Sequence, residues 1–154
     1  AEVKTMEAIF ERVNPPCTFN HCDYRGSNIL ISVADQSVKI VDAEYASYGY
    51  RCFDIATIAF EFGREKFDSQ FDRLPDDEVI KGFIEKYLTY REELSPGYRS
   101  NKHNSCEQLL TETKVCMMAQ LLFYSAFMLK QKETFIDAIP FDLDVNLVRN
   151  FETV

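Results

Sequence analysis

Three polar side chains have the types and the spacing that phosphoryl transfer to a hydroxyl group requires. Asn28 follows Asp23 by five residues and Asp42 follows Asn28 by fourteen, in the order H-x-D-x-x-x-x-N…D-x-E. The reaction needs a carboxylate that accepts the proton of the attacking hydroxyl. It also needs hard oxygen ligands for a Mg²⁺ ion on the phosphates, which a carboxamide and a second carboxylate supply. The spacing predicts Asp23 as the base and Asn28 with Asp42 as a metal site.

Each of these three residues also has an ordinary structural interpretation, because all are types that favour turns. Asp23, however, lies between Phe19 and the apolar run 29–31. An unpaired carboxylate is costly to bury in such surroundings, and this favours a functional role for Asp23. We expect His21 to brace the loop and not to act as a base.

A β-hairpin is the element expected to bring these residues together. Residues 29–33 and 38–41 are β-rich runs joined by the short segment 34–37. The two ends of such a hairpin present Asn28 and Asp42 side by side. Residues far apart in the sequence can then share one metal ion.

Most of the remaining sequence has the apolar spacing of amphipathic helices. Asp54 is expected to be an N-cap, and Ser105 with Gln108 resembles a capping box. We predict an α+β protein, mostly helical, that forms a single domain over residues 1–154, with the small antiparallel hairpin carrying the catalytic residues. The predicted helices cover 1–13, 54–62, 75–94, 105–130 and 142–152, with a polar loop over 95–104.

Composition limits the partners and the setting. The 154 residues are 46% hydrophobic, enough for one sizeable core. A formal net charge of −8 disfavours nucleic acid and anionic membranes and suits a cationic substrate. The chain shows neither a membrane-spanning stretch nor a signal-peptide pattern, so we expect no membrane insertion. Five cysteines without a C-x-x-C pair argue against a disulfide framework or a zinc site, and indicate a reducing, cytoplasmic setting.

Two stretches of the chain resemble the choline/ethanolamine kinase family, within the aminoglycoside-phosphotransferase-like small-molecule kinases. Residues 19–30, FNHCDYRGSNIL, are similar to its catalytic loop, H-N-D-x-x-x-x-N-I-L. Residues 41–56, VDAEYASYGYRCFDIA, are similar to its I-D-F/Y-E-Y-x-x-Y-N-Y-x-x-F-D-I-A/G run. The resemblance covers nearly the whole chain. It implies the C-terminal lobe of a protein-kinase-like fold, ATP and Mg²⁺ as cofactors, and a small cationic amino alcohol, choline or ethanolamine, as substrate.

The resemblance also implies roles for individual residues. It makes Asp23 the catalytic base, with Asn28 and Asp42 as metal ligands and Glu44 as an auxiliary partner of the metal or its water. Asp54 would brace the catalytic loop, an interpretation that the sequence favours no more than the plain N-cap. The substrate-binding residues would be Arg25, Tyr45, Glu61 and Phe123.

The chain departs from the family pattern in the part that would hold choline. Arg25 stands where the family often has Gln, Ala43 replaces an aromatic residue, and the chain contains no tryptophan. The aromatic positions of the late helix correspond here to Phe123 and Ala126. Because aromatic faces hold a quaternary ammonium, we expect no strong preference for choline over ethanolamine.

In such kinases the lobe that holds the nucleotide phosphates precedes the catalytic loop, and here only residues 1–22 stand before Asp23. The resemblance therefore implies that the N-terminal nucleotide lobe is absent from this chain. We expect the chain alone to lack turnover, to expose apolar surface and to self-associate, with a homodimer as one possible form. Two alternatives to an amino-alcohol kinase stay open: a kinase of another hydroxylated amine or sugar, and a lobe-only binding protein without turnover.

Overall fold

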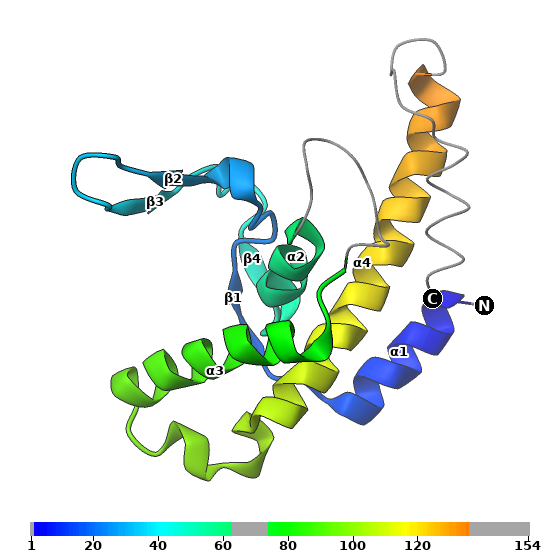
Figure 1. Ribbon diagram of the computed structural model, residues 1–154. Helices are drawn as coiled ribbons and strands as arrows, with labels where there is room; N and C mark the ends of the chain where they lie inside the picture. The colour runs from blue at the N-terminus through cyan, green and yellow to red at the C-terminus, as the bar shows by residue number, and fades with distance from the viewer. Residues whose placement is uncertain (1, 63–73, 136–154) are drawn as a thin grey trace.

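The computed structural model describes residues 2–62 and 74–135 (Figure 1). They form the mostly helical arrangement with small antiparallel sheets that the sequence predicts. The predicted helix near 142–152 lies outside the described residues. No helix in the described part of the chain is long and apolar enough to cross a membrane. The elements are α1 (Glu2–Val13), β1 (Cys17–Asn20), β2 (Ile29–Ile31), β3 (Val38–Ile40), β4 (Ser47–Tyr50), α2 (Phe53–Glu61), α3 (Asp77–Leu94) and α4 (Cys106–Phe135).

The four strands form two separate antiparallel pairs. The predicted hairpin is present as β2 and β3, with Ile29 opposite Ile40, and it extends away from the helices (Figure 1). β1 pairs with β4, placing Asn20 opposite Ser47. The sequence did not predict this second pair, because its strands are short and contain polar residues and glycine. The pair joins the two ends of the segment that carries the loop and the hairpin.

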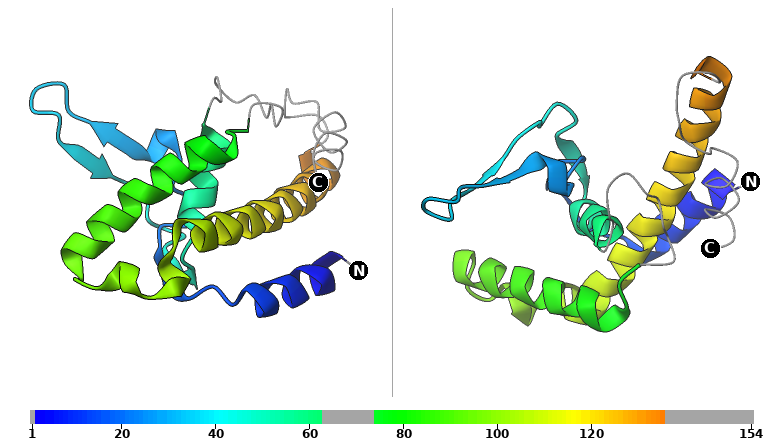
Figure 2. Two further views of the ribbon diagram at one scale, coloured as in Figure 1. Left: turned by 60° about the horizontal axis from the view of Figure 1, so that its bottom comes forward. Right: turned by 45° about the horizontal axis from the view of Figure 1, so that its top comes forward.

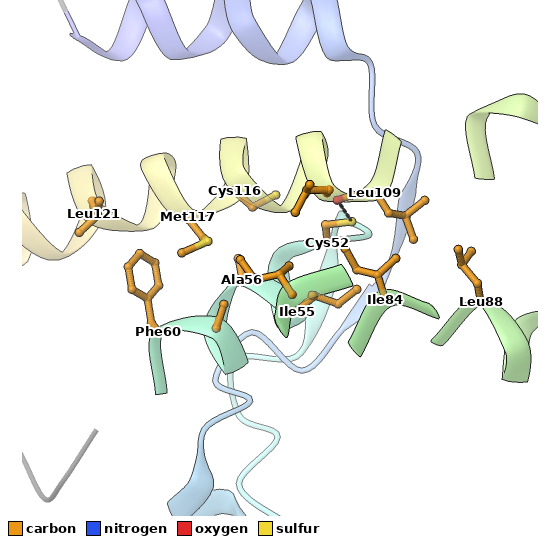
Figure 3. Packing of buried hydrophobic residues seen from close by; sticks show 13 residues of the cluster. Cys52, Ile55, Ala56, Phe60, Ile84, Leu88, Leu109, Cys116, Met117 and Leu121 are labelled. Carbon is orange, nitrogen blue, oxygen red and sulfur yellow. Dashed lines mark hydrogen bonds between the residues drawn. The ribbon is translucent and has the colours of Figure 1, made fainter. Parts of the chain in front are cut away.

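The hydrophobic core lies where α2 and α3 meet the long helix α4 (Figure 2). Cys52, just before α2, lies beside Leu109, and Phe60 near the end of α2 lies beside Leu121 (Figure 3). Successive positions along α2 therefore contact successive turns of α4. α3 contributes the predicted stripe Ile80, Ile84 and Leu88, all buried. The predicted stripe has two further members, of which Phe83 is 42% exposed and Tyr87 is half-buried against the core.

The helix starts differ in part from the sequence prediction. Asp54 is not an N-cap: α2 begins at Phe53, Cys52 occupies the cap position, and the Asp54 carboxylate bonds to a loop distant in sequence. Only half of the predicted capping box forms at α4. The Ser105 hydroxyl accepts a hydrogen bond from the Gln108 backbone N–H at 3.2 Å, whereas the Gln108 side chain donates to Glu112 at 3.0 Å.

A buried ion pair fixes the end of β4 to α4. Arg51 donates from Nε and Nη2 to the Glu112 carboxylate at 2.6 and 2.7 Å, and its other N–H groups reach Tyr98, His103 and Asn104. Burial alone would lower the pKa of Arg51, but the hydrogen bonds and charge of Glu112 outweigh it and raise this pKa above its ordinary value. All five guanidinium donors thus have acceptors. This junction holds the segment preceding α2 in one position.

Candidate active site

Asp54 holds the loop between β1 and β2. The two carboxylate oxygens of Asp54 accept hydrogen bonds from the backbone N–H groups of His21 at 2.7 Å and Cys22 at 2.9 Å. Cys22 has a φ of +66°, a left-handed conformation that is unfavourable for a residue with a side chain. The two hydrogen bonds stabilise this turn. Asp54 therefore binds the backbone of a loop distant in sequence, a contact that an N-cap would not make.

Asn28 fixes the side chain of Asp23. Its Nδ2 donates to the Asp23 backbone oxygen at 2.9 Å and to Oδ2 at 2.8 Å, and Asn28 itself is buried. The short 3-10 turn Gly26–Asn28 returns the chain so that these atoms meet. Within residues 2–62 and 74–135, Oδ1 of Asp23 has no hydrogen-bond partner. One oxygen of this carboxylate is held, and the other is available to accept a proton.

The hairpin holds the backbone of Val41, the residue before Asp42, against the backbone of Asn28. The Val41 backbone N–H donates to the Asn28 backbone oxygen at 3.0 Å, one step beyond the pairing of Ile29 with Ile40. His21 bonds through Nε2 to the Val41 backbone oxygen at 3.0 Å, so it braces this strand end. Asp42 itself is exposed and has a φ of +66°. A left-handed residue at this point indicates a backbone that its surroundings hold in place.

The side-chain oxygens of Asn28, Asp42 and Glu44 are of the type that Mg²⁺ prefers. Asn28 Oδ1 accepts one hydrogen bond, from Ser27 at 3.2 Å, and a carbonyl oxygen has a second lone pair. The Asp42 carboxylate and the exposed Glu44 add hard oxygen donors. Among the described residues, no group of three His, Cys, Asp or Glu side chains forms a ready metal site. Mg²⁺ needs no such cage, because it is commonly held by one or two carboxylates plus the phosphates of the substrate.

The residues expected to line the amine pocket lie on different elements of the described structure. Glu61 lies at the end of α2, Tyr45 in the turn before β4, and Phe123 on α4. Tyr45 and Phe123 are 63% and 65% exposed, so these rings do not enclose a cavity.

The aromatic side chains of α4 differ from those expected. Gln120 donates to the Phe53 backbone oxygen at 3.0 Å and to Thr57 at 2.9 Å, which identifies the side of α4 that contacts α2. Tyr124 lies one turn beyond Gln120 on that side, toward the end of α2 that carries Glu61. Sequence reasoning named Phe123 and Ala126 for the aromatic positions of this helix and did not single out Tyr124, because the register of α4 against α2 was unknown.

The three rings form one group on α4. Phe123 lies edge-on to Tyr124, with ring centroids 5.8 Å apart, and stacks with Phe127 at 6.5 Å. Aromatic faces of this kind can attract a cationic ligand. Although Ala126 is not aromatic, these three rings give α4 an aromatic surface.

Comparison with known proteins now assigns the family. The sequence pattern of choline/ethanolamine kinases matches residues 1–153. The chain belongs to the choline/ethanolamine kinase family. It is 32% identical over 76 residues to a probable ethanolamine kinase of Arabidopsis thaliana, a match that covers 49% of the chain and 20% of that relative. It is 24% identical over 128 residues to choline kinase alpha of Mus musculus, covering 79% of the chain and 27% of that relative.

A solved structure shares the fold of this family member. The Plasmodium vivax ethanolamine kinase Pv091845 superimposes with a TM-score of 0.73 at 23% sequence identity. The match covers 97% of this chain and 37% of that protein. The chain thus spans 20% and 27% of the two curated relatives and little more than a third of the solved one.

Proposed function

We propose that the complete protein transfers a phosphoryl group from ATP to the hydroxyl of a small amino alcohol, choline or ethanolamine. In this proposal the chain is the lobe that holds the substrate and the metal. The observation that carries it is the Asp23 carboxylate, with Oδ2 held by Asn28 at 2.8 Å and Oδ1 unpartnered within the described residues. Membership of the choline/ethanolamine kinase family supports the same reaction.

Asp23 would act on the hydroxyl of the substrate. A general base must lie within hydrogen-bond reach of the proton it accepts, roughly 2.6 to 3.2 Å between heavy atoms. Oδ1 can accept this hydrogen bond while Asn28 prevents rotation of the carboxylate. The Asp54 bonds to His21 and Cys22 hold the backbone on which Asp23 is carried.

Asn28, Asp42 and Glu44 would hold the Mg²⁺ ion through their oxygens. When bound, this ion would neutralise negative charge that develops on the phosphates during transfer. The ladder bond between Val41 and Asn28 keeps the two principal ligands adjacent. Asn28 donates a hydrogen bond from Nδ2 to Asp23 and would bind the ion through Oδ1. Asn28 would therefore set the distance between the base and the phosphates.

The amine end of the substrate would lie toward Glu61, with Tyr45 and the α4 rings Phe123, Tyr124 and Phe127 around it. A primary ammonium can pair with a carboxylate directly. A quaternary ammonium has no N–H group and depends on aromatic faces. The acidic balance of the chain, −8, favours a cation of either kind.

Substitution of Asp23 by Asn in the complete protein tests the proposal. We expect the turnover number to fall by roughly 10²- to 10⁴-fold, the usual contribution of a general base, with nucleotide affinity nearly unchanged. Asp35→Asn is the matched control, because Asp35 is an exposed carboxylate in the turn between β2 and β3. Turnover of the Asp23 variant within about threefold of the parent would remove Asp23 from this role.

A further inference from the structure

Arg25 lies beside the proposed base without being held there. Its Nε is 3.5 Å from Oδ2 of Asp23, and the two side chains are 48% and 20% exposed. Within the described residues, the Nη1 and Nη2 groups of Arg25 donate no hydrogen bond. The contrast with Arg51, whose five donors all have acceptors, is clear.

A structural role explains this arrangement poorly. Asp23 Oδ2 already accepts a 2.8 Å hydrogen bond from Asn28, so Arg25 is not needed to orient the carboxylate. A distance of 3.5 Å is also longer than the roughly 2.7 to 2.9 Å of a charge-assisted hydrogen bond. Exposed ion pairs of this kind contribute little to stability. The pair therefore leaves the guanidinium free to take another partner.

The charges around Arg25 point to the nature of that partner. The loop from His21 to Asn28 contains one Lys or Arg side chain, Arg25, and this side chain lies beside the carboxylate of Asp23. The planar fork of a guanidinium matches the oxygens of a phosphoryl group. The glutamine common at this position in the family carries no charge. This chain therefore brings a permanent cation to the place where negative charge develops in the proposed reaction.

We propose that Arg25 is a catalytic residue that binds the nonbridging oxygens of the phosphoryl group during its transfer. The inference rests on the proposed phosphotransferase function. In the step, the substrate hydroxyl oxygen forms a bond to the γ-phosphorus, and its proton passes to Asp23 Oδ1. The bond from the γ-phosphorus to the β–γ bridging oxygen breaks, and its electron pair leaves with ADP. Arg25 keeps its protons and donates hydrogen bonds from its Nη groups.

The reach of the side chain agrees with this role. The attacking oxygen lies roughly 3 Å from Asp23 Oδ1, and the phosphorus roughly 3 to 3.5 Å farther on. The transferred group is thus within about 6 to 7 Å of the Asp23 carboxylate. Arg25 already lies beside this carboxylate. The flexible arginine side chain covers that distance by releasing Oδ2. Asn28 keeps Asp23 oriented when it does so.

The position of Arg25 also orients the substrate. A cationic ammonium is repelled by the guanidinium, so the amine end must point away from the loop. Glu61 at the end of α2 offers the opposite charge. The substrate hydroxyl is then left at Asp23, where the proposed chemistry places it.

Three substitutions in the complete protein test the inference, each assayed at saturating ATP for kcat and for the KM of ethanolamine. Arg25→Gln installs the family's uncharged residue and should lower kcat by roughly 10- to 100-fold, as loss of one preorganised transition-state donor does. The KM should stay within about threefold, because the contact forms during transfer. Arg25→Lys keeps the charge but not the fork and should give an intermediate kcat. Lys39→Gln, an equal loss of charge on β3, should leave both constants unchanged.

Two results would overturn the role of Arg25. One is an unchanged kcat in Arg25→Gln, and the other is a kcat/KM for ethanolamine that rises in this variant because a repelling charge has gone. The Asp23→Asn variant, assayed in parallel, separates this failure from that of the proposed function. If Asp23→Asn is inactive while Arg25→Gln is unimpaired, only the arginine inference fails. If Asp23→Asn keeps its activity, the proposed function fails as well.

Discussion

At the scale of single residues, Asn28 connects the two tasks of the proposed site. Its nitrogen holds Asp23, and its oxygen, which accepts one hydrogen bond from Ser27, has a second lone pair for the proposed metal. The spacing from Asp23 to Asn28 predicted both as functional residues, since the pattern is visible in the sequence. The bond between them was not predicted, because it depends on the 3-10 turn that returns the chain at Gly26.

Substituting Asn28 and Asp42 separates these tasks. Asn28→Asp keeps an oxygen ligand but removes the donor to Asp23 and places a second carboxylate beside it. We expect a lower turnover number with a magnesium requirement near that of the parent. Asp42→Asn should instead raise the magnesium concentration at half-maximal rate. In the double variant, the increase in activation free energy should be smaller than the sum of the increases in the two single variants, because the residues act on one site. Magnesium titration of initial rates measures all three, and fully independent effects would argue against a shared ion.

A substitution at Asp54 tests whether its carboxylate holds the loop between β1 and β2. Asp54→Ala leaves the N–H groups of His21 and Cys22 without acceptors, and each such loss costs roughly 1 to 3 kcal/mol. The free energy of unfolding and the turnover number should both fall. Asp76→Ala is the control, because Asp76 also accepts a backbone N–H, that of Val79 at 3.0 Å, but caps α3 away from the loop. It should lower stability by about 1 kcal/mol and leave turnover unchanged. Equal effects of both variants on turnover would contradict the brace.

At the scale of elements, local patterns predicted more than long-range contacts did. The helices over 1–13 and 75–94 and the hairpin follow from spacing within a few residues. The pairing of β1 with β4 and the bond between Arg51 and Glu112 join residues distant in sequence, and neither leaves an apolar pattern. The apolar stripe predicted for α4 omitted Glu112 because a charged residue is normally exposed. Its partner, Arg51, is what makes its burial possible.

The Arg51–Glu112 pair should be far more sensitive than an exposed pair. Glu112→Ala leaves a buried guanidinium uncompensated, and we expect a loss of roughly 3 to 5 kcal/mol in the free energy of unfolding. Glu85→Ala removes the exposed partner of Arg99, 2.9 Å away, and should cost at most about 1 kcal/mol. Urea unfolding of the complete protein measures both. A Glu112 variant no less stable than the Glu85 variant would show that the pair does not fix β4 to α4.

At the scale of the whole molecule, an apolar hairpin projects from the helical body next to the proposed site (Figure 1). Ile31 and Val38, opposite each other on β2 and β3, are 62% and 58% exposed, and Val33 at the turn is 92% exposed. Exposed apolar surface of this extent marks an interaction site or a tendency to associate. The family resemblance places the phosphate-binding lobe before the catalytic loop, and the chain spans only 20% and 27% of two curated relatives.

The isolated 154-residue chain should therefore be inactive and self-associating. Asp23 and the metal ligands alone cannot position a nucleotide, because phosphoryl transfer also needs groups that hold the phosphates in line. We expect no ATP turnover above background in a preparation proved free of longer protein, and concentration-dependent association in sedimentation. Replacing Ile31 and Val38 together by Thr keeps residues that favour strands but removes apolar surface, so it should weaken association without restoring turnover. Turnover by the chain alone would contradict the proposal that it is one lobe of a kinase, whereas unchanged association of the double variant would show that the hairpin is not the contact surface.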